Sequence, residues 1–216
     1  MILPAGEHEA GPWRVEPISD VVRILAESAG SSTGPLRIIA VDGRSSSGKT
    51  TLAGRLARRD SNAHVVHTDD IAWHHSIFGW ADLLTDAILM PVRRGEAVSF
   101  RPPAWEARGR PGTIDVPAGI STLIVEGVGA SRRDLADMID ASVWVQSDLA
   151  VMQQRNLARI DAGEVPMSGH ERWMAEENPF LATQRPWERA TLVVAGTPVL
   201  PHDPSTEAVV ALPAGR

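Results

Sequence analysis

The segment from Gly43 to Thr50 (GRSSSGKT) most constrains what this chain can fold into. It fits the phosphate-binding pattern G-x-x-x-x-G-K-[ST] at every fixed position. An apolar run over residues 36–41 precedes it, and helical spacing of apolar residues follows from Lys49 to about Arg58. Strand, glycine-rich loop and helix is the context that the pattern requires, because loop N–H groups and a helix N-terminus together form an anion site. The alternative is a chance match in a Gly/Ser-rich turn, which this context disfavours.

Lys49 is the only lysine among the 21 basic residues, so arginine serves at every other basic position. A compact ammonium fits inside a phosphate-cradling loop, where a planar guanidinium is too wide. Lys49 is therefore predicted to reach the β- and γ-phosphates of a nucleotide, and the Thr50 hydroxyl to coordinate Mg²⁺. The predicted nucleotide-binding residues are Gly43, Arg44, Ser45, Ser46, Ser47, Gly48, Lys49, Thr50 and Thr51.

Composition narrows the class of protein. The 216 residues suffice for one α/β domain, and a net charge of −6 argues against a nucleic-acid partner. The absence of cysteine excludes disulfides, thiolate metal sites and cysteine nucleophiles. The first residues do not have the form of a signal peptide, and no apolar run is long enough to span a membrane, so a cytoplasmic protein is expected.

Apolar runs and helical patterns alternate along the chain. Strands are expected at residues 36–41, 64–68, 122–125, 141–145 and 191–195, with helical stretches at 19–29, 49–58, 81–94, 132–139, 148–161 and 169–183. This alternation predicts a three-layer α/β/α sandwich around a mostly parallel, five-stranded sheet. Ligands of such sheets bind at the carboxyl ends of strands, where the glycine-rich loop, Asp69-Asp70 and Glu126 all lie.

Two acidic positions beside the loop are candidates for chemistry. Asp69 can accept a proton from an attacking hydroxyl and help to position the metal, whereas Asp70 either contacts substrate or caps the next helix. Glu126 follows three apolar strand residues and is predicted to lie near Mg²⁺. Arg155 and Arg159, four residues apart on one helix face, could stabilise charge on a transferring phosphoryl group; solvated surface arginines are the alternative.

The region between Asp70 and residue 117 is predicted to contact the acceptor. Trp73 or Trp105 could stack on a flat ring, His74 could donate a hydrogen bond, and Arg101 or Arg108 could reach a hydroxyl. Packing is an equal alternative for each tryptophan. A zinc site at the nearby histidines is disfavoured because the ligand spacing and a fourth ligand are missing.

The motifs Val41–Ala53, His67–Asp70, Val125–Gly127 and Arg155 with Arg159 resemble the uridine kinase-like and phosphoribulokinase branch of P-loop kinases, and more closely its actinobacterial uridine kinase-like proteins. The resemblance covers about residues 36–161. It implies a P-loop NTPase fold with a helical lid, ATP or GTP as phosphoryl donor, and Mg²⁺. It also implies Asp69 as general base, Glu126 near the metal, and Arg155 and Arg159 in the lid. Members of the branch usually follow the Asp with an aromatic pair, but this chain has Ile71-Ala72-Trp73.

The expected division is an N-terminal arm and helix (1–35), a P-loop kinase domain (36–198) and a C-terminal tail (199–216). Within the domain, residues 149–165 are expected to form the lid and 71–117 a segment that covers substrate. The partners expected are a nucleotide and a small acceptor, with neither nucleic acid nor membrane; a homodimer stays open.

The leading functional hypothesis is an ATP-dependent kinase that phosphorylates a hydroxyl of a uridine- or cytidine-like nucleoside. The alternatives are a kinase of another hydroxylated metabolite or antibiotic, and a nucleotide-binding regulatory or accessory ATPase. A protein with an inert loop would leave Lys49, Thr50, Asp69 and Glu126 without a role.

Overall fold

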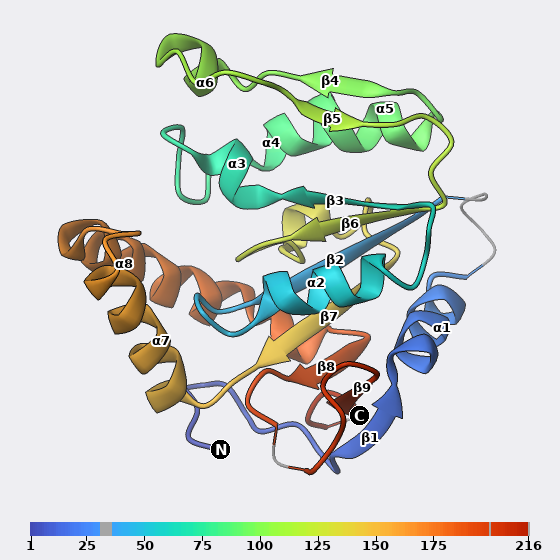
Figure 1. The fold of residues 1–216 in the computed structure, drawn as a ribbon, viewed down its shortest axis with the longest axis vertical. Helices are drawn as coiled ribbons and strands as arrows, with labels where there is room; N and C mark the ends of the chain where they lie inside the picture. Colours follow the sequence, from blue (N-terminus) through green and yellow to red (C-terminus); the bar gives the residue numbers. More distant parts are fainter. Residues whose placement is uncertain (31–35, 199, 216) are drawn as a thin grey trace.

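The central sheet of the computed structural model has seven strands in the order β1-β9-β8-β7-β2-β6-β3 (Figure 1). The structure describes residues 1–30, 36–198 and 200–215. Five strands from β8 to β3 pair in parallel, whereas β9 is antiparallel to both β8 and β1. The strands of this sheet are β1 (Arg14–Pro17), β2 (Arg37–Gly43), β3 (Ala63–His67), β6 (Thr122–Glu126), β7 (Ala141–Gln146), β8 (Leu192–Ala195) and β9 (Glu207–Ala211).

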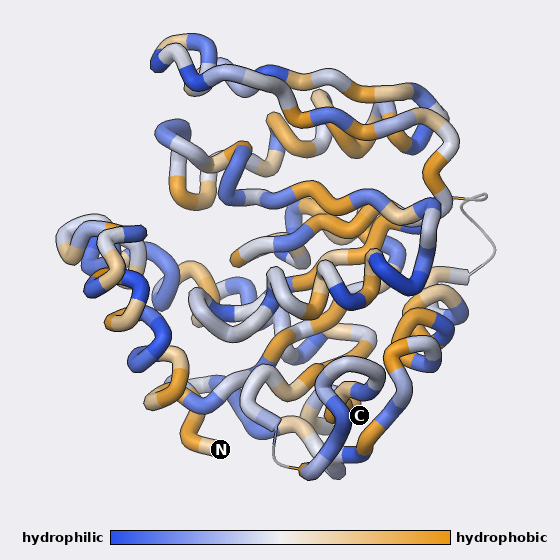
Figure 2. The backbone as a smooth tube through the Cα atoms, viewed as in Figure 1, coloured by the Kyte–Doolittle hydropathy of each residue, from blue (hydrophilic) through white to orange (hydrophobic). Residues whose placement is uncertain are grey.

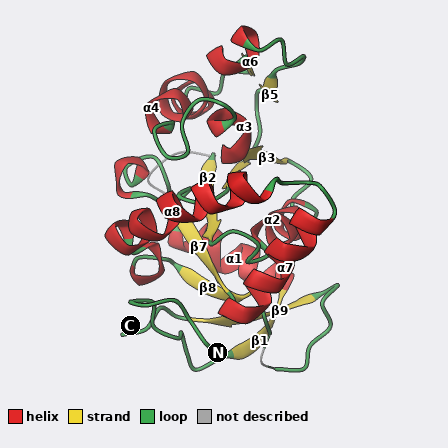
Figure 3. Ribbon diagram, turned by 90° about the vertical axis from the view of Figure 1, so that its left-hand side faces the viewer, coloured by secondary structure: helices red, strands yellow, loops and turns green. Residues whose placement is uncertain are grey.

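Helices cover both faces of the sheet, and Figure 3 shows them from the side that carries the longest two. The helices are α1 (Ile18–Ser28), α2 (Lys49–Ala57), α3 (Thr68–Ala72), α4 (Ala81–Leu84), the π-helical η1 (Thr85–Leu89), α5 (Met90–Arg93), α6 (Pro103–Ala107), the 3₁₀ turn η2 (Arg133–Leu135), α7 (Leu149–Asp161), α8 (Met167–Gln184) and the 3₁₀ turn η3 (Pro186–Glu188). A two-stranded sheet, β4 (Val98–Phe100) with β5 (Ile114–Val116), lies outside α4 and α5 in Figure 1.

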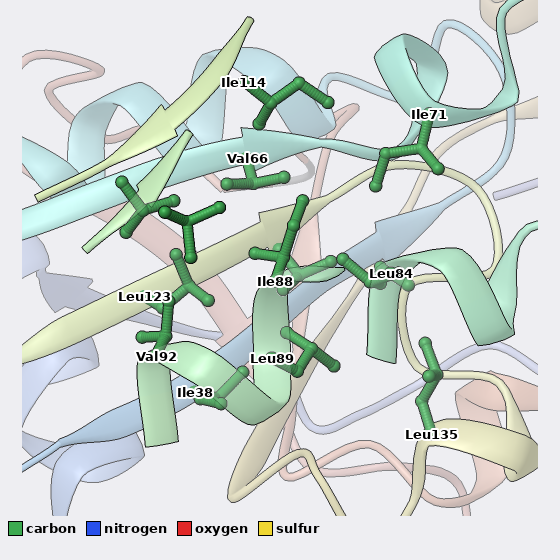
Figure 4. Close-up of a cluster of buried hydrophobic side chains, with 14 of the residues drawn as sticks. Ile38, Val66, Ile71, Leu84, Ile88, Leu89, Val92, Ile114, Leu123 and Leu135 are labelled. Atoms are coloured by element: carbon green, nitrogen blue, oxygen red, sulfur yellow. The ribbon is translucent and has the colours of Figure 1, made fainter. Parts of the chain in front are cut away.

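The side chains of β2 explain the three layers. Ile38 and Ala40 belong to the apolar cluster under α4, η1 and α5, where Figure 4 shows Ile38 close to Leu89. Ile39 and Val41 belong instead to the cluster under α1 and α2. Successive residues of a strand point to opposite faces, so a continuous apolar run buries both faces at once. The central strands are accordingly hydrophobic along their length (Figure 2).

The expectation of a five-stranded sheet is wrong in number. All five expected strands are present, and they are the five parallel ones. The other two, β1 and β9, come from the segments expected to be an arm and a tail. β1 is a four-residue edge strand that ends in Pro17, and an edge position tolerates proline because one side of the strand needs no partner. So short a strand, interrupted by prolines, has no apolar run to reveal it.

The helical expectations also need correction at two places. The segment expected as a helix over residues 132–139 contains only the three-residue turn η2. α1 begins at Ile18, one residue before the expected stretch, so Asp20 lies in the first helical turn. There its negative carboxylate interacts favourably with the positive end of the helix dipole. The other four expected helical stretches lie within a few residues of observed helices, whereas α3, α6 and η3 were not expected, and Thr68, expected in a strand, begins α3.

The expected lid corresponds to α7 and the turn after it, but α8 extends the helical structure to Gln184. In Figure 1 the two helices form a hairpin at the left, where the carboxyl ends of the parallel strands lie. No helix in the described part of the chain is long and apolar enough to cross a membrane.

Candidate functional site

The glycine-rich loop connects β2 to α2 at the point where the order of the parallel strands reverses. β2 lies between β6 and β7, and the chain passes first to β3 on one side and later to β7 and β8 on the other. Ligands of open α/β sheets bind at such a switch point. Gly48 precedes α2 with φ of 103°, a conformation that favours glycine. At the neighbouring strand end, a Cβ on Gly196 would lie 2.0 Å from the Ser47 carbonyl oxygen, so glycine is required for this close approach.

One cavity of about 950 Å³ lies over the loop and reaches the ends of β3, β6 and β8. It brings together residues that are far apart in the sequence and that were predicted to act together. The predicted site residues that line it are Ser45, Ser46, Gly48, Lys49, Thr50, Thr51, Asp69, Glu126, Arg155 and Arg159. Gly43, Arg44 and Ser47 are buried beneath it and shape the loop from below.

Lys49 is buried to 8% exposure, and its Nζ donates a hydrogen bond to the Arg44 carbonyl oxygen at 2.9 Å. This contact folds the ammonium over the loop, where it faces the cavity. Thr50 and Thr51 are exposed and line the same cavity. A cation, a hydroxyl and the free N–H groups of a helix N-terminus therefore converge on one anion-sized space.

Asp69 lies in the first turn of α3 and reaches into the cavity. The surrounding protein limits hydration of its carboxylate and raises its pKa; Lys49 opposes this shift and the charge of Glu126 adds to it. Glu126, the last residue of β6, is buried, and its Oε2 lies 2.6 Å from Nδ1 of His67. That hydrogen bond raises the pKa of His67. The two acidic side chains thus face one space from adjacent strands.

The fit of Mg²⁺ depends on Thr50, Asp69 and Glu126, which offer a hydroxyl and carboxylate oxygens to the cavity. Hard oxygen ligands are the ones that Mg²⁺ prefers. Within the described ranges, His, Cys, Asp and Glu side chains nowhere gather in a group of three suited to a metal.

The helix α7 contacts the loop through Arg155 and Asn156. The Arg155 guanidinium donates to the carbonyl oxygens of Ser46 at 3.0 Å and Gly196 at 3.2 Å. Asn156, which the sequence did not reveal, accepts from the Ser46 hydroxyl at 2.6 Å. Arg159 lines the cavity too, but its Nε is paired with Glu164 at 3.1 Å. Both arginines are exposed, so they are free to move toward a bound phosphate.

The six residues predicted to bind the acceptor gather elsewhere, around Arg110. Asp70 pairs with Arg110 at 2.6 Å, and the Arg110 guanidinium lies 3.6 Å from the Trp105 ring centre and 5.1 Å from that of Trp73. Arg101 donates to the Arg110 carbonyl oxygen. His74 packs edge-on against Trp73, and Arg108 caps α6 nearby in the chain. None of the six lines the cavity, although the structure does bring most of them together.

Two buried carboxylates that the sequence did not reveal hold the loop in place. Glu177 of α8 accepts hydrogen bonds from the backbone N–H of Ser45 at 3.1 Å and from its hydroxyl at 2.5 Å. Glu7 accepts from Nε of Arg44 at 3.0 Å and from the Trp144 indole N–H at 2.7 Å. Neither had a recognisable signal, because each partner is more than thirty residues away along the chain.

Glu7→Ala is expected to destabilise the fold by about 3 kcal/mol, because removing one partner leaves the buried guanidinium of Arg44 without its counter-charge. The Arg44 and Glu7 side chains are only 7% and 2% exposed. The free energy of unfolding in urea measures the loss. The matched control is Glu9→Ala, whose pair with the amino terminus is partly exposed and should contribute less than about 1 kcal/mol. Equal losses in the two variants would contradict a structural role of the buried pair.

Comparisons with known proteins bear on the fold. No family model matches the chain, and a search of curated proteins finds no match. Among solved structures, a possible uridine kinase from Bacillus stearothermophilus is similar with a TM-score of 0.53 at 19% identity, over 82% of this chain and 96% of the other. A candidate fructose transport system kinase from Silicibacter is similar with a TM-score of 0.55 at 20% identity, over 80% of this chain and 94% of the other. The chain therefore has the α/β fold of these two proteins, with a mostly parallel central sheet and a phosphate loop at its switch point.

Proposed function

We propose that this protein is a kinase that transfers the γ-phosphoryl group of ATP to a hydroxyl of a small acceptor, with a nucleoside as the leading acceptor. The observation that carries the proposal is one cavity that holds both Lys49 of the phosphate loop and the carboxylate of Asp69. The first suits a triphosphate, and the second suits a hydroxyl that must lose a proton as it attacks. The two similar structures, each described as a kinase, support the same class of reaction.

In this mechanism the loop N–H groups and Lys49 hold the β- and γ-phosphates while Asp69 orients the acceptor hydroxyl. Asp69 takes the hydroxyl proton as the acceptor oxygen bonds to the γ-phosphorus, and the bond from that phosphorus to the β–γ bridging oxygen breaks. Arg155 and Arg159 of the lid stabilise the charge on the phosphoryl oxygens. Bound Mg²⁺, near Thr50 and Glu126, would neutralise charge on the β- and γ-oxygens.

The raised pKa of Asp69 serves this role, since a carboxylate with a higher proton affinity is a better base once it is ionised. Lys49 opposes the shift, because its positive charge favours the ionised carboxylate. The ends of β8 and the loop after it, with Gly196 and His202, line the opposite part of the cavity and would face the nucleotide base. We expect ATP there, with GTP as the alternative donor.

A screen for ADP formation tests the proposal. The protein is incubated with Mg²⁺ and ATP or GTP, alone and with uridine, cytidine, fructose or an aminoglycoside, and each product is identified by mass. A kinase forms ADP in proportion to the acceptor and yields a product heavier by one phosphoryl group. A slow nucleotide hydrolysis that no acceptor accelerates would instead indicate a regulatory or accessory ATPase.

A further inference from the structure

Residues of α8 form part of the wall of the cavity that holds Asp69. An acceptor whose hydroxyl meets Asp69 must extend away from the phosphate loop, and the neighbouring residues that line the cavity are Val128, His170 and Trp173. Val128 follows β6, whereas His170 and Trp173 come from the first turns of α8. The tryptophans predicted for this role, Trp73 and Trp105, are instead occupied by the Arg110 guanidinium.

Trp173 is held in place from two sides. Its indole N–H donates to Oε2 of Glu177, and the same carboxylate accepts from the N–H and the hydroxyl of Ser45 in the phosphate loop. Glu177 is fully buried, so this link is protected from water. The Trp173 ring also leans against Phe78, with ring centres 5.7 Å apart at 48°. The ring is partly buried and lines the cavity, and the bonds of Glu177 couple its orientation to the loop that would bind the phosphates.

The charges of the cavity divide between its two ends. Arg155 contacts Gly196 after β8, and Arg55 donates to the Glu207 carbonyl oxygen of β9, so both lie on the β8 side of β2. Asp69 and Glu126 lie at the ends of β3 and β6, on the other side. The carboxylates of Asp69 and Glu126 line this second end, and the charge of Lys49 acts on Asp69 there. An anionic acceptor such as a sugar phosphate would be repelled there, whereas a neutral one would not.

We propose that Trp173 contacts the acceptor and that Glu177, which accepts hydrogen bonds from both Trp173 and Ser45 of the phosphate loop, holds the indole in position. The acceptor is then an uncharged alcohol with a flat ring, as a nucleoside is. A fixed indole face that lines the cavity offers stacking to a flat ring. His170 lies one turn before Trp173 on α8 and can hydrogen-bond to a ring substituent. The inference rests on the proposed kinase function and adds the acceptor side of the site to it.

The experiment compares steady-state KM and kcat of the full chain with uridine, fructose and fructose 6-phosphate as acceptors. In Trp173→Ala the KM for uridine should rise by about tenfold or more, because base–aromatic stacking contributes that much affinity, while the KM for ATP changes less than about twofold. Trp173→Phe should restore most of the uridine affinity. Fructose lacks an aromatic ring and fructose 6-phosphate carries charge, so both should be poorer acceptors than uridine for the unaltered protein.

Glu177→Gln tests the positioning role. A glutamine has one acceptor oxygen, so it can satisfy the Ser45 N–H but leaves the Trp173 N–H without an acceptor. The KM for uridine should rise by a larger factor than the KM for ATP. Trp73→Ala is the comparator, because that tryptophan lies with Arg110 outside the cavity, and it should leave the KM for uridine within about twofold.

The outcomes separate the two proposals. Three results would overturn the proposal that Trp173 contacts the acceptor and leave the kinase proposal intact. They are uridine turnover with an unchanged acceptor KM in Trp173→Ala, an equal KM increase in Trp73→Ala, and a preference for fructose 6-phosphate. A rise in the KM for ATP that matches the rise for uridine in Glu177→Gln would overturn the positioning role. No acceptor-dependent ADP with any of the three compounds would overturn the kinase proposal and the proposal for Trp173 together.

Discussion

Lys49→Ala is expected to lower kcat/KM for phosphoryl transfer by about 10³-fold, a loss typical for removing a preorganised positive charge that faces a transferring phosphoryl group. The Nζ of Lys49 lies over the loop, 2.9 Å from the Arg44 carbonyl oxygen, and faces the same cavity as Asp69. The substitution removes the one cation that the loop itself directs at the β- and γ-phosphates. The fold should persist, because the sheet and the clusters beneath α2 do not include this side chain.

Lys49→Arg separates the effect of charge from that of shape, since it keeps the positive charge but replaces a compact ammonium with a planar guanidinium. We expect it to be nearly as inactive as Lys49→Ala, because a guanidinium is too broad for the loop. Arg94→Ala is the control for a general effect of charge, because Arg94 pairs with Glu96 on the exposed surface, away from the cavity. Steady-state rates and thermal melting of all three variants give the result. Normal turnover in Lys49→Ala would exclude the proposed mechanism.

The sequence was sufficient to predict the part of the fold that buries apolar strands on both faces. Residues 36–41 and 122–125 are continuous apolar runs because β2 and β6 lie inside the sheet and contact helices on either side. The loop at Gly43 and the acidic strand ends at Asp69 and Glu126 followed from the same reasoning. The strands β1 and β9 carry no such signal: β1 is a four-residue edge strand that ends in Pro17, and β9 pairs antiparallel with β1 and β8 and has only a short apolar stretch.

The contribution of α8 to the cavity could not be predicted for a different physical reason. A tryptophan, an arginine and an aspartate can satisfy one another, as Trp105, Arg110 and Asp70 do through an ion pair and stacking, although Asp70 lies 40 positions from Arg110. The partners of the loop could not be recognised in the sequence because they come from distant parts of the chain: Glu177 is 132 positions from Ser45. A helix such as α8 shows only its apolar spacing in the sequence, and which face it turns to a cavity is decided by packing on the sheet.

Asp69→Asn is expected to reduce kcat by about 10³-fold while the Kd for ATP changes less than about threefold, because an amide has nearly the shape of the carboxylate but cannot take the acceptor proton. Asp70→Asn is the matched comparator, one residue along, since its carboxylate pairs with Arg110 outside the cavity. Asp70→Asn should lower kcat by less than about tenfold. Similar losses in the two variants, or a Kd for ATP that rises as much as kcat falls, would contradict Asp69 as base.

The pH dependence of kcat/KM provides a second readout of the same residue. The base must be ionised, and the limited hydration of Asp69 raises its pKa above that of an ordinary aspartate. Activity of the unaltered protein should therefore be full well above this raised pKa and fall as the pH drops through it, at a higher pH than a solvated aspartate would give. Asp69→Asn should lose this acid limb, because no carboxylate titrates at that position, whereas Asp70→Asn should keep it. A limb that persists unchanged in Asp69→Asn would assign the titration, and the role of base, to another group.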